Sequence, residues 1–447
     1  MIAIDHHMRL AATVNGVQFG VQLTLAYATA LAMAVIGIVT LPEAGHINPT
    51  LRLRTELLEV GHRVTYIVQP GEEASYISRN LPFDVLESPS EGAPLGFRPD
   101  VVLVEAVLVG LAVMAHAFGI PTMKLSATFP QRFDASLPPL TCDLIPDPSE
   151  SGRTKVALAW QAEHERHQAD AWYSNCADWA QRHGFPGEWI DDRAAMAATF
   201  NFPELTLAPE GLDFDRDQTD LFYAGPCVDL SRDETARASI DGYRLEQPIA
   251  YCAFGTQTHR YDKVADCITL LIEAARLLPR VKFVVSWEGD EFPNLPTNVL
   301  MLKNAPQLAL LRRAAVMVTH GGLNSVKEAL CLGVPLIVLP FDQDQPGNAA
   351  RVAFHGYGRK VSWSTTCGAA LAQHVSEVLG DSLLTRKVQT FARELQEALN
   401  RRHAARAFER CSARCLELAI ERSHGAAPVV STPGERPDTI AEESGLR

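Results

Sequence analysis

The sequence predicts an α/β protein made of two doubly wound domains that face one cleft. Two observations indicate this fold class. Short apolar runs bounded by turn residues recur in both halves of the 447-residue chain, as buried parallel strands do. Helical segments separate these runs, so each half alternates strand and helix. A chain of this length is expected to form two or three domains, and its 47% of hydrophobic residues is enough for large cores.

The first strand is expected at 34–41, where AVIGIVTL precedes the loop EAGHINP. A helix should follow, with Asn48 as its N-cap, Pro49 in its first turn and Gly61 just past its end. An apolar helix is expected at about 108–118. The remaining strands of the two domains are expected at 64–68, 101–104, 121–125, 249–253, 282–286, 316–319 and 336–339.

Charge and cysteine usage restrict the class of partner. The formal net charge of −13 argues against a nucleic-acid partner, because phosphate backbones require a basic face. The nine cysteines show no CxxC or metal-finger spacing, which favours reduced thiols in a cytoplasmic protein and no bound metal. We therefore expect small-molecule partners and a monomer or homodimer.

The opening segment has an unusual composition. No charged residue occurs from Leu10 to Pro42, and Arg9 precedes this run, so a signal peptide or membrane anchor has to be considered. The end of the run reads instead as the first buried strand, and polar residues interrupt the rest. We interpret residues 1–33 as an extension or a misplaced start, with a targeting or membrane-contact segment at 10–33 as the alternative.

The most informative stretch is His320–Gln345, HGGLNSVKEALCLGVPLIVLPFDQDQ. An apolar run precedes it and another lies within it, and the glycine pair after His320 makes a tight turn from strand to helix. Asn324 or Ser325 is the expected helix cap, and Gly333 is the expected end. This is a β-α-β unit.

The chemistry of this unit matches a nucleotide sugar. A helix that begins just past a strand directs free N–H groups and a positive dipole end at the crevice, which suits a diphosphate. His320, Asn324 and Ser325 add side-chain donors. One turn further, Glu328 can accept both hydroxyls of a ribose. Asp344 and Gln345 follow the next strand and suit sugar hydroxyls. The competing interpretation is ordinary strand-to-helix packing.

Together with Pro306, Gln307, Asn348 and Ala349, these residues resemble the donor-binding signature of the family 1 glycosyltransferases, especially the bacterial macrolide and carotenoid group. The resemblance extends from about Ala34 to Glu421. It implies the two-domain GT-B fold, with Rossmann-like domains, and a donor that is a UDP- or dTDP-hexose, glucose being the expected sugar. It also implies an inverting reaction with no metal or other cofactor.

The resemblance also assigns the donor contacts residue by residue. Asn304 stands where the family usually has an aromatic residue that stacks on the base, which leaves the base open. Gly255 and Thr256 resemble a turn that approaches the nucleotide, and Gln307 belongs to the donor signature. The diphosphate contacts implied are His320, Gly322, Asn324 and Ser325, with Glu328 at the ribose and Asp344 and Gln345 at the sugar.

The expected catalytic base is His46. A hydroxyl nucleophile must lose its proton as the new bond forms, and His46 lies at the carboxyl edge of the first strand, where α/β crevices hold ligands. It is also the base of the family motif GHxNP, here 45–49. A carboxylate that accepts its other ring N–H would fix the tautomer, and Glu105 is the one carboxylate in the run 101–109. The family has an aspartate there. The alternative is an exposed carboxylate without a role.

The acceptor is expected to be a lipophilic alcohol or phenol. Aromatic residues after the strand at 121–125 are the candidate lining: Phe129, Phe133, Trp160, Trp172 and Tyr173. The connection between Leu86 and Arg98 is short for the family, which would leave the acceptor side open.

The resemblance completes the predicted domain organisation. The stretch 229–248, rich in Asp, Arg, Ser and Glu, is the expected interdomain linker. The order is an extension at 1–33, an acceptor domain at 34–228, the linker, a donor domain at 249–395, a helix crossing back at 396–423 and a disordered tail at 424–447.

Two rival functions remain at the level of the sequence. A catalytically inactive relative that binds a nucleotide sugar, or that serves as a partner of another glycosyltransferase, would account for Asn304, Glu105 and the short connection together. A nucleotide-sugar epimerase would share the alternating plan, but it has less use for His46 or for the Asp344–Gln345 pair.

Overall fold

The computed structural model describes residues 33–85, 99–216, 220–232, 234, 240, 247–255, 263–289 and 291–425, without the side chains of 171–174 and 419–425. The expectations for residues 10–32, for the short connection at 86–98, for Thr256 and for the tail after 425 therefore lie outside the described residues.

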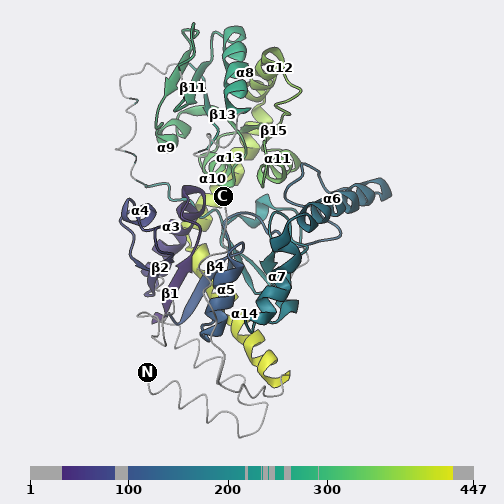
Figure 1. The fold of residues 1–447 in the computed structure, drawn as a ribbon. Helices are drawn as coiled ribbons and strands as arrows, with labels where there is room; N and C mark the ends of the chain where they lie inside the picture. The colour runs from purple at the N-terminus through teal and green to yellow at the C-terminus, as the bar shows by residue number, and fades with distance from the viewer. Residues whose placement is uncertain are drawn as a thin grey trace.

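The first domain is built on a seven-stranded parallel sheet with the order β3-β2-β1-β4-β5-β8-β9 (Figure 1). Alternate residues of its strands enter two different cores, as the pleat requires. On β4, for example, Val101 and Leu103 face one core, whereas Val102 and Val104 face the other. The strands are β1 (Val35–Val39), β2 (Arg63–Val68), β3 (Phe83–Val85), β4 (Val101–Glu105), β5 (Thr122–Ser126), β8 (Glu204–Thr206) and β9 (Leu221–Tyr223).

The second domain repeats this plan with a six-stranded parallel sheet, ordered β12-β11-β10-β13-β14-β15. Side chains of its strands are also buried in a core on each face of the sheet, with Tyr251 and Met317 on one side and Cys252 and Val318 on the other. The strands are β10 (Ile249–Ala253), β11 (Lys282–Ser286), β12 (Val299–Leu302), β13 (Ala314–Thr319), β14 (Leu336–Val338) and β15 (Gly358–Lys360). The predicted fold class is confirmed, and all eight predicted strands are present.

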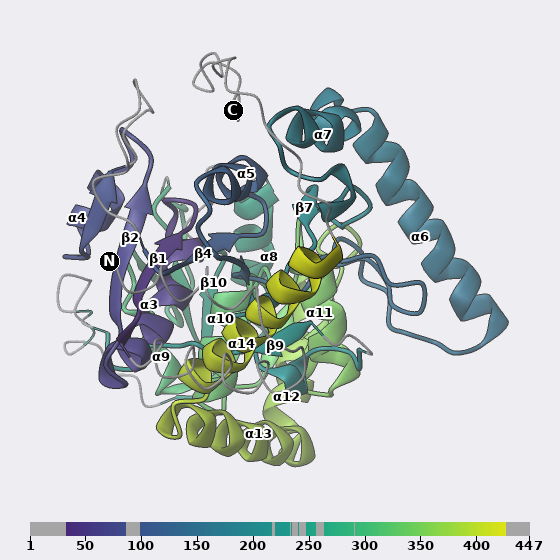
Figure 2. The ribbon, with the colours of Figure 1, turned by 90° about the horizontal axis from the view of Figure 1, so that it is seen from below.

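Helices connect the strands and pack on both faces of each sheet. The long helix α6 projects from the body of the first domain (Figures 1 and 2). A two-stranded antiparallel ribbon, β6 (Ile190–Asp191) with β7 (Thr199–Phe200), completes that domain. The helices are α3 (Ala44–Glu59), α4 (Ala74–Ile77), α5 (Val109–Ala117), α6 (Glu150–Gln168), α7 (Ala171–Arg182), α8 (Lys263–Leu277), α9 (Gln307–Leu311), α10 (Leu323–Cys331), α11 (Gln345–Phe354), α12 (Gly368–Gly380), α13 (Ser382–Asn400) and α14 (His403–Gly425).

The C-terminal helix α14 returns to the first domain and lies across its sheet (Figure 2). A turn at Arg402, with φ of +53°, separates it from α13, so the crossing helix begins at His403. Phe408 enters the core of the first domain. The buried Glu56 carboxylate accepts hydrogen bonds from the first amides of α14, Ala404 N at 2.9 Å and Ala405 N at 3.2 Å, which supplies the cap that the helix N-terminus needs.

Buried polar contacts join the two domains. Arg351 of α11 and Asp213 of the first domain form an ion pair at 2.8 Å, with both side chains 1% exposed. The guanidinium also packs against the rings of Phe129 and Phe214. On α10, the buried ammonium of Lys327 donates to the carbonyl of Leu207 at 2.6 Å. The domains therefore meet through specific polar contacts as well as apolar packing.

Candidate active site

The cleft lies where the strand order reverses in both sheets. Strand β1 pairs with β2 on one side and β4 on the other, and β10 pairs in the same way with β11 and β13. In open α/β sheets, ligands bind at the carboxyl ends of such strands. His46 follows β1 and Glu105 ends β4, while Gly255 follows β10 and His320 follows β13. The fold thus concentrates the predicted site residues at two facing edges.

His46 and Glu105 contact each other directly. The ring nitrogen Nδ1 of His46 forms a hydrogen bond and ion pair with Oε1 of Glu105. The other carboxylate oxygen accepts from the hydroxyl of Thr40 at 2.5 Å and from the amide of Leu41 at 2.8 Å. Both oxygens of the buried carboxylate are therefore used. This arrangement fixes the imidazole so that Nε2 is the nitrogen left for a substrate.

His46 lies in the first turn of α3, not in a preceding loop. The helix begins at Ala44, with Glu43 at the N-cap position and Pro49 inside it, so the expected cap at Asn48 was wrong. Burial lowers the pKa of His46, but the charge and hydrogen bond of Glu105 more than offset this, so the pKa lies above its ordinary value of 6.5. The negative charge of Asp344, from the second domain, acts in the same direction.

Pro49 has a consequence for the contact between the domains. Proline has no N–H, so the carbonyl of Gly45, four residues earlier, lacks its usual helical partner. The side-chain amide of Asn324 donates to that carbonyl at 2.7 Å. The first turns of α3 and α10 are thereby joined across the cleft, and Asn324 is engaged by protein rather than acting as a helix cap.

In the turn between β13 and α10, any residue larger than glycine would clash with its neighbours. Gly321 has φ of +94°, and Gly322 is the N-cap residue of α10, so the expectation of a cap at Asn324 or Ser325 was wrong. A Cβ at Gly322 would lie 2.7 Å from Nε2 of His320, and a Cβ at Gly255 would lie 2.9 Å from the same ring. The two glycines therefore form the walls that hold the imidazole of His320.

His320 is held in its neutral form. Burial lowers its pKa to about 4, although a hydrogen bond with the backbone of Ala253 partly opposes this. The contact expected between His320 and the diphosphate would therefore be a hydrogen bond from a neutral ring. At neutral pH its ring can donate a hydrogen bond but carries no positive charge.

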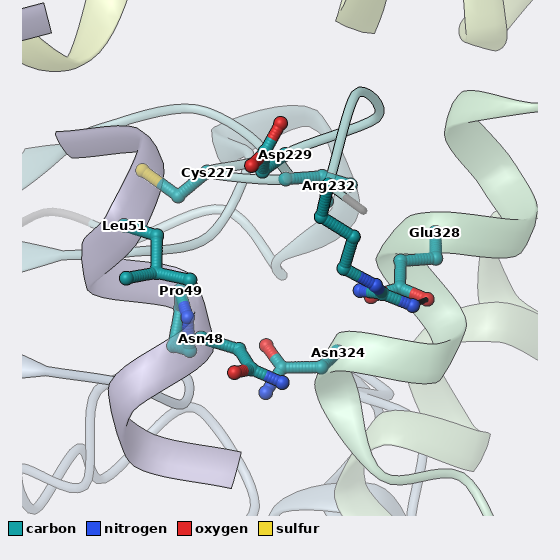
Figure 3. Close-up of a pocket in the computed structure, with 9 residues that line it drawn as sticks. Asn48, Pro49, Leu51, Cys227, Asp229, Arg232, Asn324 and Glu328 are labelled. Atoms are coloured by element: carbon teal, nitrogen blue, oxygen red, sulfur yellow. Dashed lines mark hydrogen bonds and ion pairs between the residues drawn. The ribbon is translucent and has the colours of Figure 1, made fainter. Parts of the chain in front are cut away.

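Glu328, one turn further along α10, is occupied by an arginine. The guanidinium of Arg232 binds the carboxylate with two hydrogen bonds, one of them 3.0 Å long from Nη2 to Oε2 (Figure 3). Gln307 donates to the same carboxylate at 2.7 Å and lies 3.4 Å from the hydroxyl of Ser325. The predicted ribose acceptor and its two predicted neighbours thus form one network around Arg232.

Asp344 and Gln345 lie at the start of α11. Asp344 accepts from the hydroxyl of Thr128 at 2.9 Å and from the amide of Asn348 at 2.9 Å. Burial raises its pKa, and these hydrogen bonds oppose the rise. The side-chain oxygen of Gln345 accepts from the amide of Phe341 at 2.9 Å and so holds the preceding loop. Of the two residues, Asp344 is the one whose charge raises the pKa of His46.

Three of the five aromatic residues expected to line an acceptor site pack against other side chains of the protein. Phe129 is fully buried beneath Arg351, and Trp160 is buried with its indole N–H donating to the carbonyl of Leu137 at 2.8 Å. Phe133 packs on Trp160 and carries Arg193 on its other side. These three are core or interface residues. The side chains of 172 and 173 lie outside the described residues.

Three residues of the site were not predicted from the sequence: Thr40, Thr128 and Arg232. The hydroxyls of the first two complete the hydrogen bonding of Glu105 and Asp344. The one available signal concerned Arg232, because a carboxylate at Glu328 that is buried on a helix requires a cationic or hydrogen-bonding partner.

Two kinds of feature are absent from the described part of the chain. No group of three or more His, Cys, Asp and Glu side chains there is arranged to hold a metal ion. No helix in the same part is long and apolar enough to span a membrane.

Comparison with known proteins supplies an independent view. Residues 246–394 match the family described as UDP-glucoronosyl and UDP-glucosyl transferase. The chain is 24% identical to the NDP-glycosyltransferase YjiC of Bacillus licheniformis, covering 84% of this chain and 96% of that protein. It is 23% identical to the oleandomycin glycosyltransferase of Streptomyces antibioticus, covering 93% and 96% respectively. Among solved structures, the glycotransferase of kitacinnamycin superposes with a TM-score of 0.62 at 26% identity, over 87% of this chain and 98% of that one.

Proposed function

The chain is a family 1 glycosyltransferase with the GT-B fold, and we propose that it moves a hexose from a UDP- or dTDP-sugar to a hydroxyl group of a lipophilic small molecule. Glucose is the proposed sugar. Relatives named for natural-product substrates, such as the oleandomycin glycosyltransferase, support this class of acceptor. No metal ion takes part in the proposed reaction.

The proposed reaction is a single inverting displacement. Nε2 of His46 takes the proton of the acceptor hydroxyl while its oxygen forms a bond to C1 of the α-linked donor. The bond from C1 to the diphosphate breaks, and the nucleoside diphosphate leaves with the electron pair, so the product is a β-glycoside. Glu105 stabilises the imidazolium that forms, because its carboxylate already binds Nδ1.

The donor is proposed to lie along the carboxyl edge of the second sheet. The N-terminus of α10 and the neutral ring of His320 would donate hydrogen bonds to the diphosphate, with Gly255, which follows β10, beside it. Gln307 and Glu328 would bind the ribose, and Asp344 with Gln345 the hexose. To bind the nucleotide sugar, the side chains of Asn324 and Glu328 must release their present protein partners, Gly45 and Arg232.

One observation carries this proposal: a histidine fixed by a buried carboxylate lies at the carboxyl end of β1, in the helical turn that Asn324 of α10 contacts across the cleft. A base from the first domain and a sugar-binding carboxylate from the second are the two groups that a transfer across the cleft requires. An epimerase acts on the sugar alone and has no use for a base that is directed at a separate acceptor.

The test is product formation. The protein is incubated with UDP-glucose or dTDP-glucose and a panel of phenols, macrolides and hydroxylated terpenoids, and glycosylated masses are read by mass spectrometry. We expect product from the wild type and a loss of roughly 10²–10⁴-fold in His46→Ala. His183→Ala, at a histidine that binds the carbonyl of Trp179, is the matched control and should retain activity. Thermal stabilisation by the donor without any product would instead support the nucleotide-sugar binder.

A further inference from the structure

The segment that follows the first domain enters the donor site. Its residue Arg232 extends from the interdomain connection toward α10 and reaches Glu328 (Figure 3). The same segment is fixed on both sides of this contact. Arg312 donates to the carbonyl of Leu230 at 2.6 Å, and the carboxylate of Glu234 accepts from the amide of Leu308 at 3.2 Å. Arg232 is therefore held close to the site rather than extended into solvent.

Arg232 also borders the opening between the domains. This opening has an empty volume of about 260 Å³ and is lined by residues of α3, of the connection and of α10, among them Asn48, Asn324 and Glu328. Among the described residues of this lining, Arg232 is the one cationic side chain. Its Nε atom is buried and has no hydrogen-bond partner in the described structure. Arg232 is therefore the described cation that a ligand in this opening would meet.

A nucleotide sugar places a diphosphate beside this opening, and the described cations near it are few. His320 is neutral at physiological pH because burial lowers its pKa to about 4. Lys327 is fully buried, and its ammonium already donates to the carbonyl of Leu207 in the first domain. The helix dipole alone amounts to roughly half a charge. Arg232, which borders the opening and reaches Glu328, is placed to add a full positive charge beside the departing diphosphate.

We propose that Arg232 is a donor-binding residue that exchanges the carboxylate of Glu328 for the diphosphate of the nucleotide sugar. The exchange frees Glu328 to accept the ribose hydroxyls, so one movement prepares both subsites. This assignment rests on the proposed function of the site, since it requires a diphosphate-containing donor.

The geometry and chemistry of the exchange are both favourable. Asn324 lies four residues before Glu328 on α10, which is about 6 Å along the helix axis and within the swing of an arginine side chain. The planar guanidinium binds phosphate oxygens in the same paired fashion as it binds a carboxylate. The ion pair that is broken at Glu328 is therefore replaced by another of the same kind, while the carboxylate gains two hydroxyl donors.

The test compares nucleotides that differ only in phosphate. Binding of UDP, uridine, dTDP and thymidine is measured by calorimetry for the wild type, Arg232→Gln, Arg232→Lys and Arg312→Gln. We expect Arg232→Gln to weaken binding of the diphosphates by roughly 10- to 100-fold, and binding of the nucleosides to stay unchanged or become tighter. Arg232→Lys should recover part of the loss. Arg312→Gln removes a tether of the same segment but leaves the guanidinium of Arg232 in place, so it should weaken diphosphate binding much less than Arg232→Gln does.

Two results overturn the assignment in different ways. If Arg232→Gln changes the affinities for diphosphate and nucleoside by the same factor, Arg232 only occupies the ribose site and does not bind phosphate. If the wild type binds neither UDP nor dTDP, the proposed function fails and the assignment of Arg232 fails with it.

Discussion

Replacement of Glu105 by glutamine tests the catalytic pair most sharply. In the wild type, the amide of Leu41 and the hydroxyl of Thr40 both donate to Oε2, and His46 binds Oε1. A glutamine in the same position keeps its oxygen toward the two donors and turns its NH₂ group toward Nδ1 of His46. Nδ1 must then accept, so the ring proton moves to Nε2, the nitrogen that should take the proton of the acceptor.

The expected magnitude follows from this change of tautomer. General-base catalysis contributes roughly 10²–10⁴-fold, and the variant loses both the base and the charge that stabilises the imidazolium. We therefore expect kcat to fall by about 10²–10⁴-fold, equivalent to about 3–5 kcal/mol of transition-state stabilisation. Without the carboxylate charge, burial lowers the pKa of His46, so the acid limb of the pH–rate profile should move to lower pH.

The assay is the pH dependence of kcat/KM with the acceptor that the panel identifies. Glu56→Gln is the matched control, because Glu56 is equally buried but caps α14 and binds Arg52, away from His46. It should lower stability and leave the acid limb in place. A Glu105→Gln enzyme with a rate within about threefold of the wild type and an unmoved acid limb would refute the role of the pair.

Three further predictions concern the donor pocket and the contact between the domains. Gly322→Ala should weaken UDP binding by about tenfold in calorimetry, because the added Cβ would lie 2.7 Å from the ring of His320. Gly380→Ala is the control and should not weaken binding, because no atom lies within 4 Å of the Cβ that it adds. Equal UDP affinities of the two variants would contradict the account. Arg351→Met should lower the free energy of unfolding by about 3 kcal/mol in urea titrations. This is the low end for a broken buried ion pair, because Asp213 keeps Arg216 and Tyr223 as partners. A loss below about 1 kcal/mol would contradict the stabilising role of the pair. Although burial disfavours the charge of Asp213, neighbouring arginines hold its pKa at about 2. The contribution of Asp213 to stability is therefore complete above about pH 4 and is lost as the pH falls toward 2. Urea titrations from pH 5 to pH 2 should show this loss of stability, and the loss should be smaller in Arg351→Met.

The alternating fold could be predicted because its signals are local. Each buried parallel strand is a short apolar run, as AVIGIVTL illustrates, and such runs are visible without knowledge of the partner strand. Helix boundaries were predicted less well. The first turn of α3 has no side-chain cap, and Pro49 lies inside the helix, so the usual start signals pointed five residues too far along the chain.

The site could be predicted in part for the same reason. His46, Glu105 and His320 follow or end apolar runs, and the topology of a doubly wound sheet brings such positions together. Glu328 lies in the helix that follows one of these runs. Arg232 could not be placed, because its partner lies 96 residues away and the segment around it has no periodic pattern. The neutral state of His320 was also missed, since burial between two glycines is a property of the folded chain.

The stereochemistry of the product tests the central claim most directly. The wild-type enzyme is given an α-linked nucleotide sugar and the identified acceptor, and the anomeric configuration of the new glycoside is determined by proton NMR. Direct attack assisted by His46 predicts a β-glycoside. An α-glycoside would contradict the single displacement and the role assigned to the His46–Glu105 pair.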